Sequence, residues 1–374
     1  MPAKKPDPSA KLSRGKRRFT GHFGRPALTF VVALSMTAVA AGGYGVSAAS
    51  ASATSKLVAS HVKSTKPYSL TSTWTAVGDT PHFTAVDYAL GRVFVSNLTE
   101  GTLSVLNLQG VLIDNIKLGG VVHTVEVDQA TGMVYATDIV RGYLDVVNAS
   151  SYKVVAQIPV AAHLHGLAVS NSLHLAIVTD VAQSKIYLIN TVTNHVITTK
   201  GIGVGVNPWG VAIDAARKLA YVANTGIDPF AQPSALAVNP KGDSVSVVSL
   251  ATDKVISTIP VGPHPWNLAI TQTGVVYVGV QGGNEVAVIQ DGRVASDISV
   301  GTSPHGVAYD PVRKMIFVNN SVSNTASVIS TRSNTVIQTI PVGSQPQGIS
   351  VDVLTGDAYV ANQATASISV ISPN

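Results

Sequence analysis

The chain has 374 residues, of which 45% are hydrophobic, 6% aromatic and 12% charged, and it contains no cysteine. This composition excludes wholesale disorder, disulfides, thiolate metal sites, iron–sulfur clusters and cysteine nucleophiles. The formal net charge of +5 arises in the first 25 residues, which hold eight of the 25 Lys and Arg and one of the 20 Asp and Glu. The rest of the chain is therefore close to neutral, and nucleic acid is not expected as a partner.

Residues 1–53 have the three parts of a secretory signal peptide. A basic stretch is followed by an apolar run over 26–41 and then by small residues suited to cleavage. We expect the protein to be exported, whether secreted, periplasmic or on the cell surface. Two alternatives stay open: a twin-arginine export route, because Arg17 and Arg18 are adjacent, and an uncleaved N-terminal segment that anchors the chain in the membrane. Residues 54–68, rich in Ser, Thr and Lys, are predicted to form a flexible linker.

Residues 69–374 consist of seven copies of one unit. Each copy reads Val-Gly-x-x-Pro, a short apolar strand, a tight turn, Tyr-Val-x-Asn, a loop, a second β-branched strand and Val-Ile-x-x-Ile-Pro-Val. The Val-Gly position recurs every 39 to 57 residues, at Gly78, Gly119, Ala161, Gly205, Gly262, Gly301 and Gly343. This period, with β-branched runs and no helical pattern, predicts an all-β fold, a seven-bladed β-propeller with four short strands in each blade.

The two ends of the repeat region predict how the ring closes. The last copy ends at Ser372 after three strands, and an unassigned strand, TSTWTAV over 71–77, precedes the first copy. We expect this N-terminal strand to complete the last blade, which removes the open edges that a linear array would expose.

Most of the repeated polar and glycine positions are predicted to be structural. The glycine of Val-Gly is expected to adopt backbone angles closed to other residues. Short polar side chains end the first and second strands of the units, where they can hydrogen-bond their own turns. They are Asp87, Asp128, Asp214, Asp310 and Asp352 on the first strand, and Asn97, Asp138, Asp180, Asn224, Asn320 and Asn362 on the second.

The three motifs Val-Gly-x-x-Pro, Tyr-Val-x-Asn and Ile-Pro-Val-Gly resemble those of the YVTN repeat proteins, which include YncE-like exported seven-bladed propellers. The resemblance covers essentially all of residues 70–374. It implies a surface, periplasmic or secreted binding protein. Related propellers include lactonases, a streptogramin lyase and the propeller part of nitrous oxide reductase, so the resemblance specifies the fold far better than the function.

The residue after the proline of Val-Gly-x-x-Pro is the candidate functional position. In chain order it is His82, His123, His165, Trp209, Trp266, His305 and Gln347, and His163 and His264 lie two positions before their units' members. Because this position opens the innermost strand, all seven side chains are predicted to surround one mouth of the central channel. We call these seven residues the axial ring.

The axial ring supports several functions. Aromatic faces beside imidazole donors and acceptors suit a small polar or glycan-like ligand, or an envelope protein, and a ligand- or partner-binding module is the function we favour. A divalent metal, Zn or Cu, held by His82, His123 and His165 is an alternative that would support a metal-dependent lyase or lactonase-type enzyme. A structural cell-surface scaffold, in which the histidines only bond backbone groups, is the third alternative.

Two departures from the repeat extend this hypothesis. Glu126 lies on an inner strand where the other six units carry Ala or Ser, and a carboxylate in such a tight place needs a partner. It is a candidate general base, ligand acceptor or metal ligand, or else it bonds a neighbouring blade or water in the channel. The fourth unit carries an insertion over 225–244 that should overhang the mouth beside Trp209, with Asp228, Phe230 and Gln232 as candidate ligand contacts.

Overall fold

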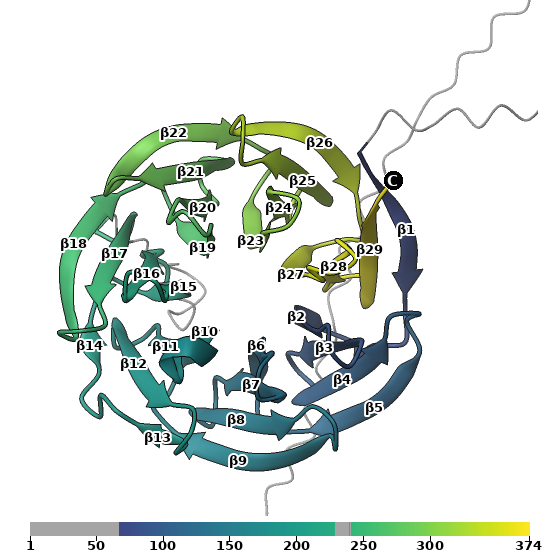
Figure 1. Ribbon diagram of the computed structural model, residues 1–374, viewed down its shortest axis with the longest axis horizontal. Coiled ribbons are helices and arrows are strands. Elements are labelled where there is room, and N and C mark those ends of the chain that lie inside the picture. Colours follow the sequence, from purple (N-terminus) through teal and green to yellow (C-terminus); the bar gives the residue numbers. More distant parts are fainter. Residues whose placement is uncertain (1–66, 229–238, 240) are drawn as a thin grey trace, which may run out of the picture. The chain divides into compact units, whose positions relative to one another are not determined.

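The computed structural model describes residues 67–228, 239 and 241–374. These residues form seven antiparallel sheets arranged around a central axis, so the prediction of a seven-bladed β-propeller is confirmed (Figure 1). The predicted signal peptide and all but the last two residues of the predicted linker lie outside the described residues. Within the described ranges no helix is both long and apolar enough to cross a membrane.

Each blade runs from an inner strand at the axis to an outer strand at the rim. Blade 1 comprises β2 (Pro81–Asp87), β3 (Arg92–Asn97), β4 (Thr102–Asn107) and β5 (Leu112–Lys117), and blade 2 comprises β6 (Val122–Asp128), β7 (Met133–Asp138), β8 (Tyr143–Asn148) and β9 (Lys153–Pro159). Blade 3 has β10 (Leu164–Ser170), the 3-10 turn η1 (Asn171–Leu173), β11 (Leu175–Asp180), β12 (Lys185–Asn190) and an outer strand split into β13 (His195–Val196) and β14 (Ile202–Gly203).

The remaining blades follow the same order. Blade 4 comprises β15 (Pro208–Asp214), β16 (Leu219–Asn224), β17 (Ser244–Ser249) and β18 (Lys254–Pro260), and blade 5 comprises β19 (Pro265–Ile270), β20 (Val276–Val280), β21 (Glu285–Gln290) and β22 (Arg293–Ser299). Blade 6 has β23 (Pro304–Asp310), β24 (Met315–Asn320), β25 (Thr325–Ser330) and β26 (Thr335–Pro341), and blade 7 has β27 (Pro346–Val351), β28 (Ala358–Asn362) and β29 (Ser367–Pro373).

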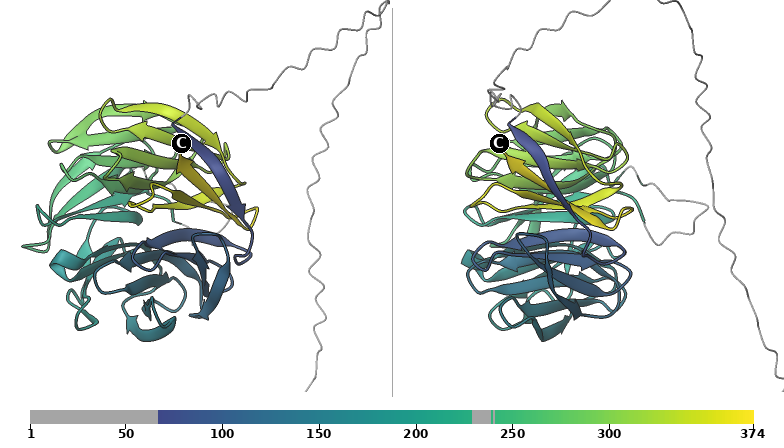
Figure 2. Two further views of the ribbon diagram at one scale, coloured as in Figure 1. Left: turned by 45° about the vertical axis from the view of Figure 1, so that its right-hand side comes forward. Right: turned by 90° about the vertical axis from the view of Figure 1, so that its right-hand side faces the viewer.

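The outer strand of blade 7 is the N-terminal strand β1 (Tyr68–Trp74), as the sequence predicted, and it lies antiparallel beside β29 (Figures 1 and 2). The predicted bounds, 71–77, were three residues too late. The strand begins earlier because the Tyr68 ring packs edge-on against Phe317 of blade 6, with their centroids 5.3 Å apart. At its other end Trp74 is buried against Tyr359, so an aromatic side chain anchors each end of the closing strand.

The hydrophobic core of the described propeller is divided into seven clusters, one between each pair of neighbouring blades. The first residue of each Tyr-Val-x-Asn motif lies in these clusters, and Phe94, Tyr135, Phe317 and Tyr359 are at most 1% exposed. Fully burying one such side chain contributes about 1.5–3 kcal/mol. Each blade is thus stabilised by its neighbours, and closure of the ring gives both terminal blades a partner.

The asparagines that end the second strands connect strands within a blade. In four blades the Asn side-chain nitrogen donates to two hydroxyls of the third strand, at 2.9–3.2 Å: Asn97 to Thr102 and Ser104, Asn224 to Ser244 and Ser246, Asn320 to Thr325 and Ser327, and Asn362 to Ser367 and Ser369. The prediction that these asparagines bond their own turns was therefore wrong. It holds for the two aspartates, since Asp138 and Asp180 accept backbone N–H groups from the turns that follow them.

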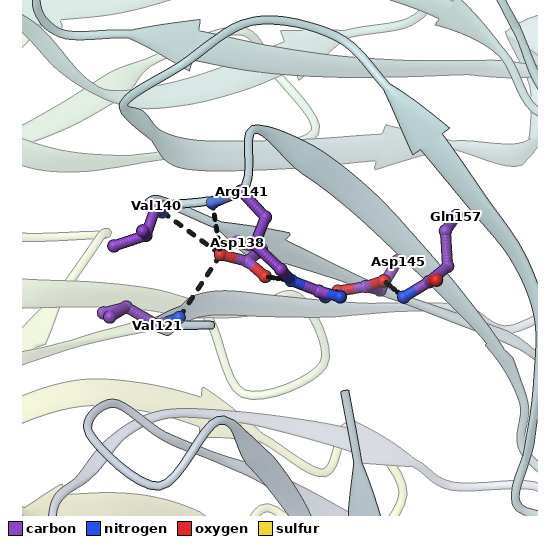
Figure 3. Close-up of polar contacts among 6 residues, drawn as sticks. All are labelled: Val121, Asp138, Val140, Arg141, Asp145 and Gln157. Carbon is purple, nitrogen blue, oxygen red and sulfur yellow. Dashed lines mark hydrogen bonds and ion pairs between the residues drawn. The ribbon is translucent and has the colours of Figure 1, made fainter. Parts of the chain in front are cut away.

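Blade 2 replaces this amide–hydroxyl contact with a charged network (Figure 3). Asp138 accepts N–H groups from Val121, Val140 and Arg141, and the Arg141 guanidinium contacts both Asp138 and Asp145. Gln157 donates to the other oxygen of Asp145 at 2.7 Å. Both carboxylate side chains are 0% exposed, and burial raises the pKa of Asp145 to about 6.

The aspartates that end the first strands bond their own turns, as predicted. The side chains of Asp87, Asp128, Asp214, Asp310 and Asp352 each accept a backbone N–H from two or three residues further on. In blades 4 and 6 an arginine, Arg217 or Arg313, pairs with the aspartate and also donates to a backbone carbonyl of the next blade. This contact connects neighbouring blades at the end of the channel where the inner strands finish.

The glycine of Val-Gly is required for space rather than for backbone freedom, so the conformational prediction was wrong at most positions. Gly119 has a positive φ, but Gly78, Gly205, Gly262, Gly301 and Gly343 do not. A Cβ added to Gly343 would lie 2.5 Å from Cγ of Asn362, the residue that bridges the second and third strands of its blade. The glycine and the asparagine of the repeat are therefore one packing unit.

We expect the substitution Gly343→Ala to lower the free energy of unfolding by about 1–3 kcal/mol, because the new methyl group displaces the Asn362 amide from its two hydroxyl partners. Gly203→Ala is the matched control, since a Cβ at Gly203 meets nothing within 4 Å. Urea unfolding of the two variants measures the difference. Equal stability would show that the Asn362 amide can move without cost.

Candidate ligand-binding site at the channel mouth

All seven residues of the axial ring line a single cavity at one end of the channel. Its volume is about 310 Å³, and Leu98, Val121, Ile139 and Gln363 complete its lining. The side chains reach the axis because every inner strand has a register shift directly after its first residue. Such a bulge turns a side chain away from the regular alternation of a strand.

The backbone of the axial ring is held by the second strand of the preceding blade, a contact that the sequence reasoning missed. The hydroxyls of Ser96, Thr137 and Thr179 donate to the carbonyls of His123, His165 and Trp209, respectively, at 2.6–2.9 Å. In blade 6, the Asn319 amide donates to the carbonyl of Gln347. These donors occupy the variable position of Tyr-Val-x-Asn. A hydroxyl or amide side chain at that position could have predicted the contact from the sequence.

The axial ring is a packed layer that spans the axis. Neighbouring ring centroids are 4.3 Å apart for His82–His123, 4.6 Å for His123–His165, 4.4 Å for His165–Trp209, 3.9 Å for Trp209–Trp266 and 5.0 Å for Trp266–His305. All members except Trp266 are less than 10% exposed. The sequence predicted the convergence of these side chains but not that they fill the channel. The cavity is therefore a cup with an aromatic floor.

The imidazoles of the layer are neutral at neutral pH. Burial is the main cause: it lowers the pKa of His165 to about 4 and that of His305 to about 3, and it holds the pKa values of His82 and His123 well below the usual range. The Nε2 atoms of His82 and His123 are 3.0 Å apart, so one ring donates its N–H to the other. A neutral imidazole offers one donor and one acceptor.

Three ring nitrogens of the layer have no hydrogen-bond partner within the described part of the chain. They are Nδ1 of His82, Nδ1 of His305 and Nε1 of Trp209, and all three atoms are buried. A buried polar atom without a partner costs about 1–3 kcal/mol of free energy. Because these three atoms are buried, a ligand in the cup can bond them only if side chains of the layer move.

His163 and His264, the other two predicted ligand contacts, are turn residues and do not line the cavity. Both adopt a positive φ, 64° and 57°, in the loops that enter β10 and β19. The His264 imidazole lies 3.1 Å from the carbonyl of Thr225, and its backbone N–H donates to Asp243. His264 therefore holds both ends of the insertion in the fourth unit.

The insertion joins β16 to β17, as predicted, and its described ends lie at the mouth side of blade 4. The N–H groups of Thr225 and Gly226 donate to the carbonyls of Asn207 and Val206 in the loop that enters β15. Asp228 is half-buried at the edge of the described segment. Phe230 and Gln232 lie outside the described residues, so their predicted contact with a ligand stays a prediction.

Glu126 does not belong to the mouth. It lines a second cavity of about 370 Å³, formed by the inner strands beyond the axial ring, and no residue lines both cavities. The structure therefore separates Glu126 from the cavity where the enzyme hypothesis placed it. In the described part of the chain no three His, Asp or Glu side chains are arranged to hold a metal ion.

Comparison with known proteins identifies the fold. No protein-family model matches the chain, and no curated protein does. Among solved structures, hydrazine synthase from Kuenenia stuttgartiensis is similar, with a TM-score of 0.65 and 14% identity over 80% of this chain and 97% of that one. At that identity the likeness shows the propeller architecture alone.

Proposed function

We propose that the protein is an exported binding module that holds a small polar, glycan-like ligand in the cup at its channel mouth. The observation that carries the proposal is the axial ring itself. Six of its seven members are aromatic or imidazole rings, each from a separate blade, and they floor a cavity of about 310 Å³. That volume is at the lower end of small-molecule sites.

The chemistry of the cup favours a ligand with one apolar face and polar edges. Trp266 is the most exposed member of the floor, and its ring offers a face for stacking. Leu98, Val121 and Ile139 give one side of the rim an apolar surface, whereas Gln347 and Gln363 supply amides on the adjoining side. The neutral imidazoles add donors and acceptors without a charge, so an uncharged ligand fits better than an ion.

The two other functions have less support. A lyase or lactonase would need Glu126 beside the histidines, but Glu126 lines a different cavity. A pure scaffold gives no role to the cavity of about 310 Å³ that the axial ring floors. The resemblance to YVTN repeat proteins supports a binding role at the envelope, since members are mostly described as surface, periplasmic or secreted binding proteins.

Tryptophan fluorescence tests the proposal directly, because two of the three tryptophans lie in the floor of the cup. In a Trp74→Phe background, methyl glycosides and N-acetylglucosamine are the probes. We expect at least one probe to change the emission saturably. Trp266→Ala should lower the affinity for that probe by fivefold or more, which corresponds to a loss of about 1 kcal/mol of stacking. If no probe alters the emission while the protein remains folded, the scaffold hypothesis replaces the binding module.

A further inference from the structure

The cavity that contains Glu126 is separate from the mouth and has its own chemistry. It has a volume of about 370 Å³ and is lined by residues from the inner strands of all seven blades. The axial ring closes it on one side, since its packed side chains are almost fully buried and line the mouth cavity instead. The channel beyond the ring is therefore a pocket with a closed end.

Glu126 is the single carboxylate or amine among the residues lining this channel pocket. At the equivalent position the other blades carry small side chains, Ala85, Ala168, Ala212, Ala269, Ala308 and Ser350, which leave space at the axis. No group in the described part of the chain hydrogen-bonds or pairs with the Glu126 carboxyl. The remaining polar side chains of the lining are uncharged at neutral pH, among them Thr84, Thr124 and Asn267.

Further carboxylates lie at the ends of the inner strands, on the side of the pocket away from the axial ring. Asp214 and Asp310 are paired with arginines. In contrast, Asp87, Asp128 and Asp352, which belong to the adjacent blades 1, 2 and 7, form no ion pair within the described residues. These three aspartates accept backbone N–H groups of their own turns, and Arg92 lies opposite Asp87 in the β2–β3 register, so Glu126 supplies the charge inside the pocket itself.

We infer that the channel pocket is a second ligand site, which takes a small organic ammonium ion with its charged group on the Glu126 carboxylate and its apolar part against the alanine-lined wall. A single carboxylate with neutral hydroxyl and amide neighbours matches the three N–H donors of an ammonium group. It does not match a divalent metal, which requires several oxygen ligands. The inference is independent of the mouth ligand, because the two cavities share no lining residue.

Titration with n-butylamine, followed by NMR or calorimetry at pH 8.5, tests the inference. At that pH an alkylamine is protonated, with a pKa near 10.4 as in lysine. The Glu126 carboxyl is ionised there too, since burial raises its pKa to about 7. We expect saturable binding of n-butylamine and at least tenfold weaker binding of n-butanol, which has the same size without the charge.

Substitutions locate the bound amine. Glu126→Gln should weaken n-butylamine binding at least tenfold, while Glu285→Gln, the same change outside the pocket, should leave it unaltered. Ala168→Leu should block binding by filling the pocket without removing the charge, which keeps the inference testable if Glu126→Gln unfolds. Trp266→Ala should leave n-butylamine binding unchanged. A negative result for the channel pocket is therefore distinguishable from a negative result for the ligand at the mouth.

Three results would overturn the inference. They are the absence of saturable n-butylamine binding by the unsubstituted chain, equal affinity for n-butanol, and unchanged amine affinity in folded Glu126→Gln or Ala168→Leu protein.

Discussion

Replacing Arg141 with methionine should destabilise the propeller by about 3–5 kcal/mol at pH 8, one of the two largest effects that we expect from its structure. The substitution leaves two carboxylates, Asp138 and Asp145, without the guanidinium that contacts both. Each of these side chains is 0% exposed, so water cannot replace the lost partner. The methionine side chain keeps most of the packing volume and isolates the loss of charge.

The pH dependence of this loss identifies its cause. The folded-state pKa of Asp145 is about 6, above its unfolded value, so its ionisation costs stability as the pH rises from about 4 to 6. Without Arg141 that pKa rises further and the cost continues to grow at higher pH. We therefore expect the destabilisation by Arg141→Met to be smaller at pH 5, where Asp145 takes up a proton, than at pH 8.

Two further variants complete the experiment, with urea unfolding as the measurement. Arg217→Met removes an ion pair in which the arginine is 48% exposed, and it should cost at most about 1 kcal/mol. The triple change Asp138→Asn, Arg141→Thr and Asp145→Ser removes all three charges and gives blade 2 one of the two amide–hydroxyl contacts of blade 7, that of Asn362 with Ser369, so it should recover part of the stability. A loss below 1 kcal/mol for Arg141→Met at pH 8 would mean that the buried carboxylates find other partners.

Acidification should destabilise the propeller through the axial ring. All four of its histidines have folded-state pKa values below the usual 6.5, at about 4 for His165 and about 3 for His305. Their contribution to stability is fully present above pH 6.5 and is lost as the pH falls toward 4, because the unfolded chain binds these protons first. Each unit of difference between the folded and unfolded pKa values corresponds to about 1.4 kcal/mol. Protonation of the four histidines should therefore lower the free energy of unfolding by several kcal/mol.

Protonation of Glu126 raises the stability of the folded state over part of this pH range, opposite to the effect of the histidines. Because burial raises the pKa of Glu126 to about 7, its protonation stabilises the folded state as the pH falls from 7 to 4.5. The net loss of stability should therefore steepen below pH 5, where Glu126 gives no further compensation. Thermal unfolding midpoints between pH 8 and pH 4 record this profile.

Glutamine substitutions attribute the profile to individual residues. The double variant His82→Gln/His123→Gln places at two positions the amide that Gln347 already provides at the seventh, and its midpoint should fall less steeply below pH 6.5. His195→Gln, on the exposed outer strand β13, is the matched control and should follow the unsubstituted protein. A double variant with an unchanged slope would contradict the assignment of the acid sensitivity to the axial ring.

The repeat pattern was enough to predict the blades, the ring closure and the membership of the axial ring. These features depend on local patterns: β-branched runs, turn residues and a fixed position after each proline, such as His82 and Trp209. The same reasoning assigned the first-strand aspartates correctly, because an aspartate that accepts an N–H two or three residues away acts within its own turn. The prediction for Gly343 was wrong, because this residue lies in the bend between β26 and β27 and its constraint comes from Asn362 at the end of β28.

By itself, then, the sequence determined a seven-bladed propeller closed by its N-terminal strand, with histidines and tryptophans at one end of the channel. Only the tertiary structure decided that these rings pack into a layer, that Glu126 lies in a separate pocket beyond it, and that Arg141 contacts two buried carboxylates. The physical reason is that side-chain volume and charge are balanced across blades and strands. Residues distant in the chain must fill one space together, and their spacing in the sequence does not record how they fill it.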